Sequence, residues 1–414
     1  MSNQALVSAL CVLEPVLDIV LEPVDEPSAP AWCVSRGWDG FLLGLSDAEL
    51  AVGEARGLFD VVEGRADTPS SLRRLVQDVE TVTRVASLGA SSLELPGASW
   101  RGIPLRKRGQ IAAFLPVLEP LARRAERVVD VGAGKGHLSR LAAELFGRDT
   151  VAWDREAAHV RAGEQRAEAR ARDVGELRLR FVVEDALVRE PELRATDLAV
   201  GLHACGELGD RLVSLAAGAR CDLALISCCL QKVRSSARAP LSETKGFPAL
   251  PRAALGLTNL STSPDGVEAS LEDNLRARRT RLGLRQLLRA RGLEVAPGEE
   301  MRGVNRRQAQ RGLAALARRV CSVRLLSPPS DAEVEANERS AAVAYARIRR
   351  LSLPRNLLAR LVELAVVLDR AALLEERGLA VLVARLFERD LTPRNLALFA
   401  SADPARLPRP HVAQ

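Results

Sequence analysis

Three glycines at alternate positions, Gly132, Gly134 and Gly136, constrain the fold of this chain more than any other feature. They follow a short apolar run, 127–131, and precede an amphipathic stretch, 137–146. Glycine permits positive φ angles and close backbone approach to a ligand, and the first turn of a helix leaves N–H groups unpaired. The pattern predicts a strand, a ligand-binding turn and a helix at the carboxyl edge of a parallel sheet.

Short apolar runs alternate with longer amphipathic stretches through much of the chain. Runs of about five residues separated by helical patterns are typical of βαβ units around a parallel sheet. We therefore predict an α/β fold with a Rossmann-like seven-stranded sheet, closed by a long helix over 355–377 and an antiparallel pair of strands. The predicted strands are 127–131, 150–153, 179–183, 197–202, 222–227, 379–386 and 395–400.

The same rhythm predicts the domain boundaries. Residues 1–100 alternate apolar helical-period stretches with Pro- and Gly-rich breaks, which indicates a mainly helical N-terminal region. The sheet domain is expected to be discontinuous, over 101–234 plus 352–402. Residues 235–351 are predicted to form a helical insertion, and residues 403–414 a loose tail.

Three acidic residues at the ends of the first three predicted strands distinguish between two cofactors. Asp130 lies on the strand before the glycines, which gives D-x-G-x-G-x-G, whereas a dinucleotide site usually has G-x-G-x-x-G. This spacing favours S-adenosylmethionine (SAM), with Asp130 at its amino acid end, directly or through water. Asp154 would hold the ribose hydroxyls and Asp185 the adenine amino group. The alternative is that each acid only caps a helix.

The predicted ends of strands four and five carry groups that could act on the methyl acceptor. His203 is either a general base or a residue that orders its loop. Cys205 and Cys228 follow neighbouring strands, so a thiolate that attacks a pyrimidine ring is one hypothesis and buried small side chains are the other. Zinc bound by His203, Cys205, Cys228 and Cys229 is a further alternative, but the ligand spacing matches no known zinc module, so no metal is expected.

Composition constrains the partners and the cellular location of the protein less than the motifs constrain its fold. The net charge of +6 and the pI near 9.2 permit a polyanionic partner such as RNA, although solvated surface is the more common origin of such charge. The seven cysteines form an odd set without repeated spacing, which favours a reducing compartment. Glu14 and Asp18 interrupt the N-terminal apolar run, which also lacks a basic flank. We expect a cytoplasmic protein without a membrane partner.

These segments together resemble methyltransferase-like protein 25 and its relatives, some of which are named ribosomal RNA adenine dimethylase domain-containing proteins. The resemblance covers roughly residues 105–400 and implies a class I SAM-dependent methyltransferase. The similar segments are Asp130-Val131-Gly132-Ala133-Gly134-Lys135-Gly136-His137-Leu138-Ser139, Gly201-Leu202-His203-Ala204-Cys205-Gly206, Ser227-Cys228-Cys229, Pro240-Leu241-Ser242 and Leu391-Thr392-Pro393-Arg394-Asn395-Leu396.

Two segments depart from the family pattern. The family usually has Lys-Lys-x-His-Glu before the first strand, where this chain has residues 106–110, with Lys107 but with Gln110 in place of Glu. After the two cysteines it tends to carry Tyr, then His or Met, where Leu230 and Gln231 stand here. An aromatic platform for the acceptor is lost, which implies a different acceptor or reduced activity.

The sequence therefore predicts a SAM-dependent methyltransferase that acts on RNA, either tRNA or rRNA. The His-x-Cys-Gly and Cys-Cys segments are also similar to those of a tRNA ribose 2′-O-methyltransferase family, and no Asn-Pro-Pro-Tyr-type segment for adenine N6 methylation follows strand four. A protein or small-molecule methyltransferase and a non-catalytic SAM-fold RNA-binding or assembly protein are the alternatives. The candidate catalytic residues are His203, Cys228 and Lys107, and the candidate cofactor-binding residues are Asp130, Gly132, Gly134, Lys135, Gly136, Asp154, Asp185 and His203.

Overall fold

The structure is a computed structural model of the 414-residue chain, and it describes residues 2–89, 93–260, 271–388, 391–392 and 394–410. It divides into two compact units, which we describe separately. The first unit comprises Met1–Val16, Val79–Ser261 and Ala359–Gln414, and the second comprises Leu17–Asp78 and Thr262–Leu358.

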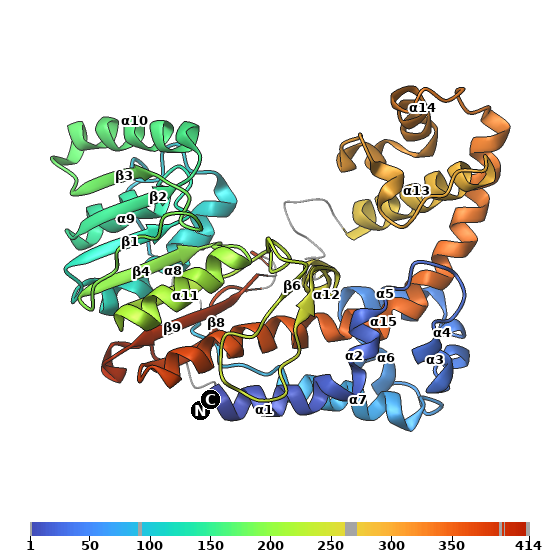
Figure 1. The fold of residues 1–414 in the computed structure, drawn as a ribbon, viewed down its shortest axis with the longest axis horizontal. Coiled ribbons are helices and arrows are strands. Elements are labelled where there is room, and N and C mark those ends of the chain that lie inside the picture. The colour runs from blue at the N-terminus through green and yellow to red at the C-terminus, as the bar shows by residue number, and fades with distance from the viewer. Residues whose placement is uncertain (1, 90–92, 261–270, 389–390, 393, 411–414) are drawn as a thin grey trace. The chain divides into compact units, whose positions relative to one another are not determined.

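A seven-stranded sheet in the order β3-β2-β1-β4-β5-β9-β8 forms the centre of the first unit (Figure 1). Strands β1 to β5 pair in parallel, while β9 is antiparallel to both β5 and β8. This arrangement confirms the predicted Rossmann-like fold of class I methyltransferases. The strands are β1 (Arg127–Val131), β2 (Asp149–Asp154), β3 (Leu179–Val183), β4 (Asp197–Leu202), β5 (Asp222–Ile226), β8 (Ala380–Arg385) and β9 (Leu396–Ser401).

Helices cover both faces of this sheet because its central strands are apolar on both sides. Helices α8 (Leu105–Ala122) and α9 (His137–Phe146) pack on the face that presents Leu198 and Val200 of β4. Helix α11 (Glu207–Ala219) packs against β4 and β5 on the other face, where Leu212 lies close to Gly201. Helix α10 (Ala157–Val174) packs against β3 and β2.

Helix α15 (Asp331–Glu376) extends the predicted helix 355–377 far toward the N-terminus. Pro354, directly before the predicted start, lies inside the helix although proline disrupts helical hydrogen bonding. The helix belongs to the second unit up to Leu358 and to the first unit from Ala359. Its last turns carry Asp369 and Arg370, both fully buried.

Parts of the first unit differ from the predicted helical insertion and helical N-terminal region. Strands β6 (Ala237–Arg238) and β7 (Leu250–Pro251) form a small antiparallel sheet, and helices α12 (Arg252–Gly256) and η2 (Leu257–Leu260) follow it. Residues 86–88 are extended and hydrogen-bond to Arg385 at the β8 edge of the main sheet. This segment covers an edge that would otherwise expose unpaired backbone groups.

The second unit is helical, as predicted for most of its residues. Leu284, Leu316 and Val320 form one of its cores, in which α13 packs against α14. Its helices are α2 (Leu17–Leu21), α3 (Ala31–Ser35), α4 (Asp39–Leu43), α5 (Asp47–Ala55), α6 (Leu58–Glu63), most of α7 (Ser70–Val82), α13 (Leu271–Ala290), η3 (Glu299–Met301), η4 (Arg306–Arg311), α14 (Leu313–Val323) and the first part of α15.

Both ends of the chain form regular structure within the residues that the structure describes. Helix α1 (Ser2–Leu13) and the turn η1 (Glu14–Val16) precede α2, and the whole stretch Ser2–Leu21 is long and apolar enough to cross a membrane by composition. Leu6, Leu13 and Ile19 are nevertheless buried within the protein. At the other end, Asp403 caps the turn η5 (Pro404–Arg406), so the predicted loose tail is wrong for its first residues, and 411–414 lie outside the described residues.

Candidate active site

The carboxyl ends of the five parallel strands meet at one edge of the sheet. The glycine turn follows β1, Asp154 ends β2 and Asp185 follows β3. His203 follows β4, and Cys228 follows β5. The sheet therefore brings together at one edge the side chains that the sequence analysis singled out, which is where ligands bind in open α/β sheets.

The glycine turn has the backbone geometry that the sequence pattern predicted. Gly134 has φ +60°, and a Cβ added there would meet nothing within 4 Å. Gly136 has φ +62°, and a Cβ there would lie 2.5 Å from the ring of Phe181. Only glycine fits at Gly136 because of packing, whereas Gly134 leaves open space for a ligand. The neighbouring Lys135 is exposed.

Asp154 holds the glycine turn in place. Its Oδ2 accepts a hydrogen bond from Gly134 N at 2.7 Å, and its Oδ1 accepts one from Glu156 N at 2.9 Å. The carboxylate thus fixes both the turn and the start of α10. Each oxygen has a second lone pair, so these bonds leave Asp154 able to accept from a ribose hydroxyl as well.

Asp130 is a buried carboxyl group beneath the turn. Its Oδ2 accepts a hydrogen bond from Ser139 Oγ at 2.6 Å. Burial raises the pKa of Asp130 to about 6, even though this hydrogen bond and the ammonium of Lys107 act in the opposite direction. The protein therefore stabilises the negative charge of Asp130 only in part, and a ligand ammonium group beside this carboxylate would stabilise it further.

Asp185 has partners of its own. Its Oδ1 accepts from Leu187 N at 3.0 Å, and its Oδ2 pairs with the half-exposed guanidinium of Arg234 at 3.0 Å. The remaining lone pairs can still accept from an adenine amino group. The sequence analysis did not foresee the Arg234 partner, which comes from a segment 49 residues away.

Lys107 lies on α8, and its ammonium attracts the carboxylates of Asp130 and Asp154. It also acts electrostatically on His203. Lys107 is exposed, so it can reach a ligand at this edge of the sheet. The sequence suggested Lys107 as a candidate catalytic residue, and the structure places it near two acids of the predicted cofactor site.

His203 is held in an unusual conformation. Its φ is +68°, a region that few non-glycine residues adopt, and its N–H donates to Ile226 O of β5 at 2.8 Å. Its Nε2 lies 2.9 Å from Gln110 Oε1, and the second amide atom of Gln110, Nε2, has no partner although it is buried. Burial and the nearby cations Lys107 and Arg106 lower the pKa of His203 to about 4. The imidazole is therefore neutral at physiological pH.

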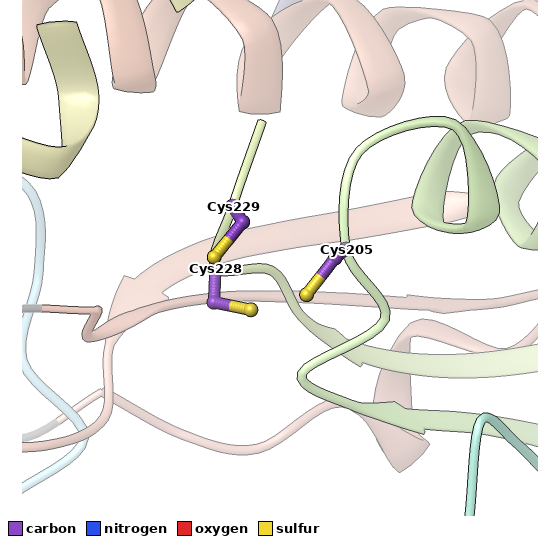
Figure 2. A group of neighbouring side chains, drawn as sticks. All are labelled: Cys205, Cys228 and Cys229. Carbon is purple, nitrogen blue, oxygen red and sulfur yellow. The ribbon is translucent and has the colours of Figure 1, made fainter. Parts of the chain in front are cut away.

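Three cysteines lie close together in the loops after β4 and β5 (Figure 2). The sulfur atoms of Cys205, Cys228 and Cys229 all lie within 4.8 Å of one another. Cys205 Sγ donates to His203 O at 3.1 Å, and Cys228 Sγ lies 3.8 Å from the same carbonyl. Hydrogen bonds to the other two sulfurs and burial raise the pKa of Cys228, which disfavours a thiolate at that position.

The part of the chain that contains these strand ends matches a known protein family. Residues 106–236 match the family model described as "Methyltransferase domain". They include β1 to β5, the glycine turn and the acids Asp130, Asp154 and Asp185. Residues 106–236 therefore form a methyltransferase domain.

Three solved structures are similar to this chain, at TM-scores too low to bear on its activity. A Galdieria sulphuraria protein assigned as a sarcosine dimethylglycine methyltransferase is 16% identical, and the match covers 36% of this chain and 58% of that one, with a TM-score of 0.24. Coclaurine N-methyltransferase is 16% identical over 60% of this chain and 71% of its own, at 0.26. PKMT2 from Rickettsia typhi is 12% identical over 54% and 37%, at 0.23.

The residues present fit SAM. The open space at Gly134 lets a cofactor approach the protein backbone closely. The buried carboxyl group of Asp130 can pair with the amino group of SAM. Asp154 and Asp185 can each accept further hydrogen bonds. Glycines and acids at these strand ends were all identified from the sequence.

Sequence reasoning missed a buried arginine of the first unit. Arg370 of α15 donates to Gly206 O at 3.0 Å and to Ser227 Oγ at 2.5 Å. It thus joins the loop after β4 to the loop after β5. The signal was visible, because Asp369 and Arg370 interrupt an otherwise apolar helical stretch, and charged residues are rarely buried without partners.

Proposed function

We propose that this methyltransferase acts on RNA, either tRNA or rRNA, in the cytoplasm. The observation that carries the proposal is a group of cations from three segments of the first unit. Arg106 and Lys107 from α8, together with Arg394 before β9, act on His203, and Lys232 and Arg394 act on Cys229. Cations gathered at the end of the sheet where the acceptor must enter favour a polyanionic acceptor.

The acids and the glycine turn would hold the cofactor. Asp130 would face the amino group of SAM, Asp154 its ribose hydroxyls and Asp185 its adenine amino group, while the backbone from Gly132 to Gly136 would lie along it. When bound, SAM supplies an activated methyl group on a sulfonium. The protein aligns the acceptor with that methyl group, and such alignment can supply a large part of the rate enhancement.

His203 would orient the acceptor more than it would take its proton. An efficient general base has a pKa near the working pH, but that of His203 is lowered to about 4. Its Nε2 is occupied by Gln110, which leaves Nδ1 available to a ligand. A strongly acidic acceptor group, or one without a proton to lose, suits this environment best.

We also propose that the chain belongs with methyltransferase-like protein 25 and its relatives but accepts a different substrate. Leu230 is buried, and Gln231 Oε1 is buried without a partner, at the positions where those relatives tend to carry Tyr and then His or Met. Gln110, in place of their Glu, leaves His203 without an anionic partner. Both differences alter the acceptor side and leave the cofactor side intact.

Transfer of labelled methyl groups tests the proposed function. The purified chain is incubated with methyl-labelled SAM and with RNA-depleted or protein-depleted lysate from cells that lack it. We expect label that ribonuclease removes, and no label with the Gly134→Arg variant. Label found in protein alone would refute an RNA acceptor, and SAM binding without transfer to either fraction would favour the non-catalytic RNA-binding alternative.

A further inference from the structure

The group formed by Cys205, Cys228 and Cys229 has the donor atoms of a metal site. The three thiols come from two loops, one after β4 and one after β5, and their sulfur atoms converge (Figure 2). Cys205 stands 23 residues from Cys228 along the chain, a spacing that no zinc module uses. Strands β4 and β5 are neighbours in the sheet, however, so the fold brings together cysteines that are distant in the sequence.

The separation of the sulfur atoms suits one ion. Three thiolates at about 2.3 Å from a tetrahedral zinc ion lie about 3.8 Å from one another. The three sulfurs here already lie within 4.8 Å of one another. An iron–sulfur cluster needs its cysteines farther apart because several irons and sulfides separate them, so a single thiophilic ion fits better.

The backbone around the thiols is fixed in place. His203 N donates to Ile226 O at 2.8 Å, and Glu207 N donates to Lys232 O at 3.0 Å, so each end of one loop is tied to the other. A Cβ on Gly206 would lie 2.2 Å from Lys232 O, which shows how closely the loops approach. Arg370 also bridges them. Such preorganisation reduces the conformational cost of gathering three ligands.

The surroundings favour a zinc–thiolate complex whose net charge is negative. Zinc with three thiolates has a net charge of −1, and the cations of Lys232 and Arg394 lie close enough to act on Cys229. The three cysteines are half-buried, which leaves a path for an ion. No fourth His, Cys, Asp or Glu joins the group in the part of the chain that the structure describes.

We propose that Cys205, Cys228 and Cys229 bind one zinc ion and leave its fourth coordination position to an external ligand. The three thiols release their protons to solvent as the ion binds. Structural zinc sites are closed by four protein ligands, whereas three protein ligands and an open position are typical of catalytic sites.

An open zinc position could assist methyl transfer. A donor atom of the acceptor, or a water molecule, bound there would have a lowered pKa. This use of the ion rests on the proposed methyl transfer. The metal site itself does not, and it can be tested without any acceptor.

Cobalt binding tests the site on the full chain. The reduced, chelator-treated protein is titrated with Co²⁺, whose thiolate charge-transfer absorption reports sulfur ligation, and is then back-titrated with Zn²⁺. We expect one ion per chain, displaced by one equivalent of zinc. Cys205→Ser, Cys228→Ser and Cys229→Ser should each weaken binding by at least about tenfold. Cys11→Ser removes an exposed thiol of α1 and should change nothing.

Calorimetry with SAM shows whether each variant remains folded, and it separates this proposal from the proposed function. A serine variant that binds SAM normally but binds no cobalt supports the metal site. Absence of the charge-transfer band in the reduced wild type would overturn it. So would equal cobalt affinity in Cys228→Ser, or a disulfide between Cys205 and either neighbour in protein purified without reductant, because that pair would then act as a redox couple.

Discussion

Arg370 and Asp210 form a buried ion pair, in which Arg370 Nε donates to Asp210 Oδ1 at 2.8 Å. Asp210 also pairs with Arg238, which in turn reaches Asp369 at 2.8 Å. Burial alone would raise the pKa of Asp210, but the two arginines outweigh it and lower that pKa. Opposite charges thus alternate through a network in which Arg370 also anchors the loops that carry His203 and the cysteines.

Replacement of Arg370 by Met should destabilise the protein strongly. Removal of one partner from a buried pair leaves uncompensated charge and typically costs about 3–5 kcal/mol. Arg123→Met breaks an exposed pair with Glu119 and should cost less than about 1 kcal/mol. Urea unfolding of both variants measures the difference. Similar midpoints would show that the network contributes little.

The strands were predictable because each combines a short apolar run with a polar boundary. The five parallel strands and the closing pair lie within one residue of their predicted bounds. The two-residue strands β6 and β7 carry too little pattern to be recognised. The full extent of α15 was hidden because Pro354 imitates a helix boundary.

Partners distant in sequence could not be predicted. The glycines and acids of the cofactor site follow from their position at strand ends. In contrast, the contact between Gln110 and His203 joins residues 93 positions apart, and the grouping of Cys205 with Cys228 depends on β4 and β5 being neighbours. These relationships are set by tertiary packing, which a single sequence does not record.

Gln110→Glu should raise the pKa of His203. A carboxylate 2.9 Å from Nε2 would stabilise the imidazolium, and an opposite charge at this range raises a histidine pKa by about 1–3 units. We expect a value near that of an ordinary histidine instead of about 4. Nuclear magnetic resonance titration of the imidazole checks this. Gln110→Met, which removes the hydrogen bond without adding charge, should leave the value low, and equal values in the two variants would contradict the pairing.

SAM affinity should fall as the pH drops below about 6. The pKa of Asp130 is raised to about 6, so its carboxylate takes up a proton in that range and no longer attracts the ammonium of SAM. At the limit the loss approaches roughly tenfold per pH unit. His137 and His203 both titrate near pH 4 and do not contribute to this change. Calorimetry between pH 5 and 7.5 measures it.

Two variants test the assignment to Asp130. Asp130→Asn should bind SAM more weakly and without this pH dependence. Ser139→Ala removes a hydrogen bond that favours the carboxylate, so it should move the midpoint to higher pH. The stability of the apo protein depends on pH in the opposite direction from SAM affinity. Because the folded pKa is raised, the apo protein should lose stability as the pH rises from about 4 to about 6. An unchanged midpoint in both variants would refute the role of Asp130.

Lys232→Ala should weaken RNA binding uniformly across sequences. If Lys232 contacts a phosphate, its loss should reduce the slope of log affinity against log salt concentration by about one. Lys245→Ala removes an exposed lysine elsewhere in the same unit and should leave the slope unchanged. Filter binding at several salt concentrations compares the two. Equal slopes would argue against a phosphate contact at the cysteine loops.

Calorimetry of SAM binding to two arginine variants tests the central claim most directly. Gly134 and Gly147 have φ angles of +60° and +61°, and neither has an atom within 4 Å of an added Cβ, so arginine strains both positions alike. Gly134 lies in the turn before α9, and Gly147 caps the far end of that helix. The account predicts normal SAM binding by Gly147→Arg and at least about a tenfold loss in Gly134→Arg. Equal binding by both variants would contradict a SAM site at the glycine turn.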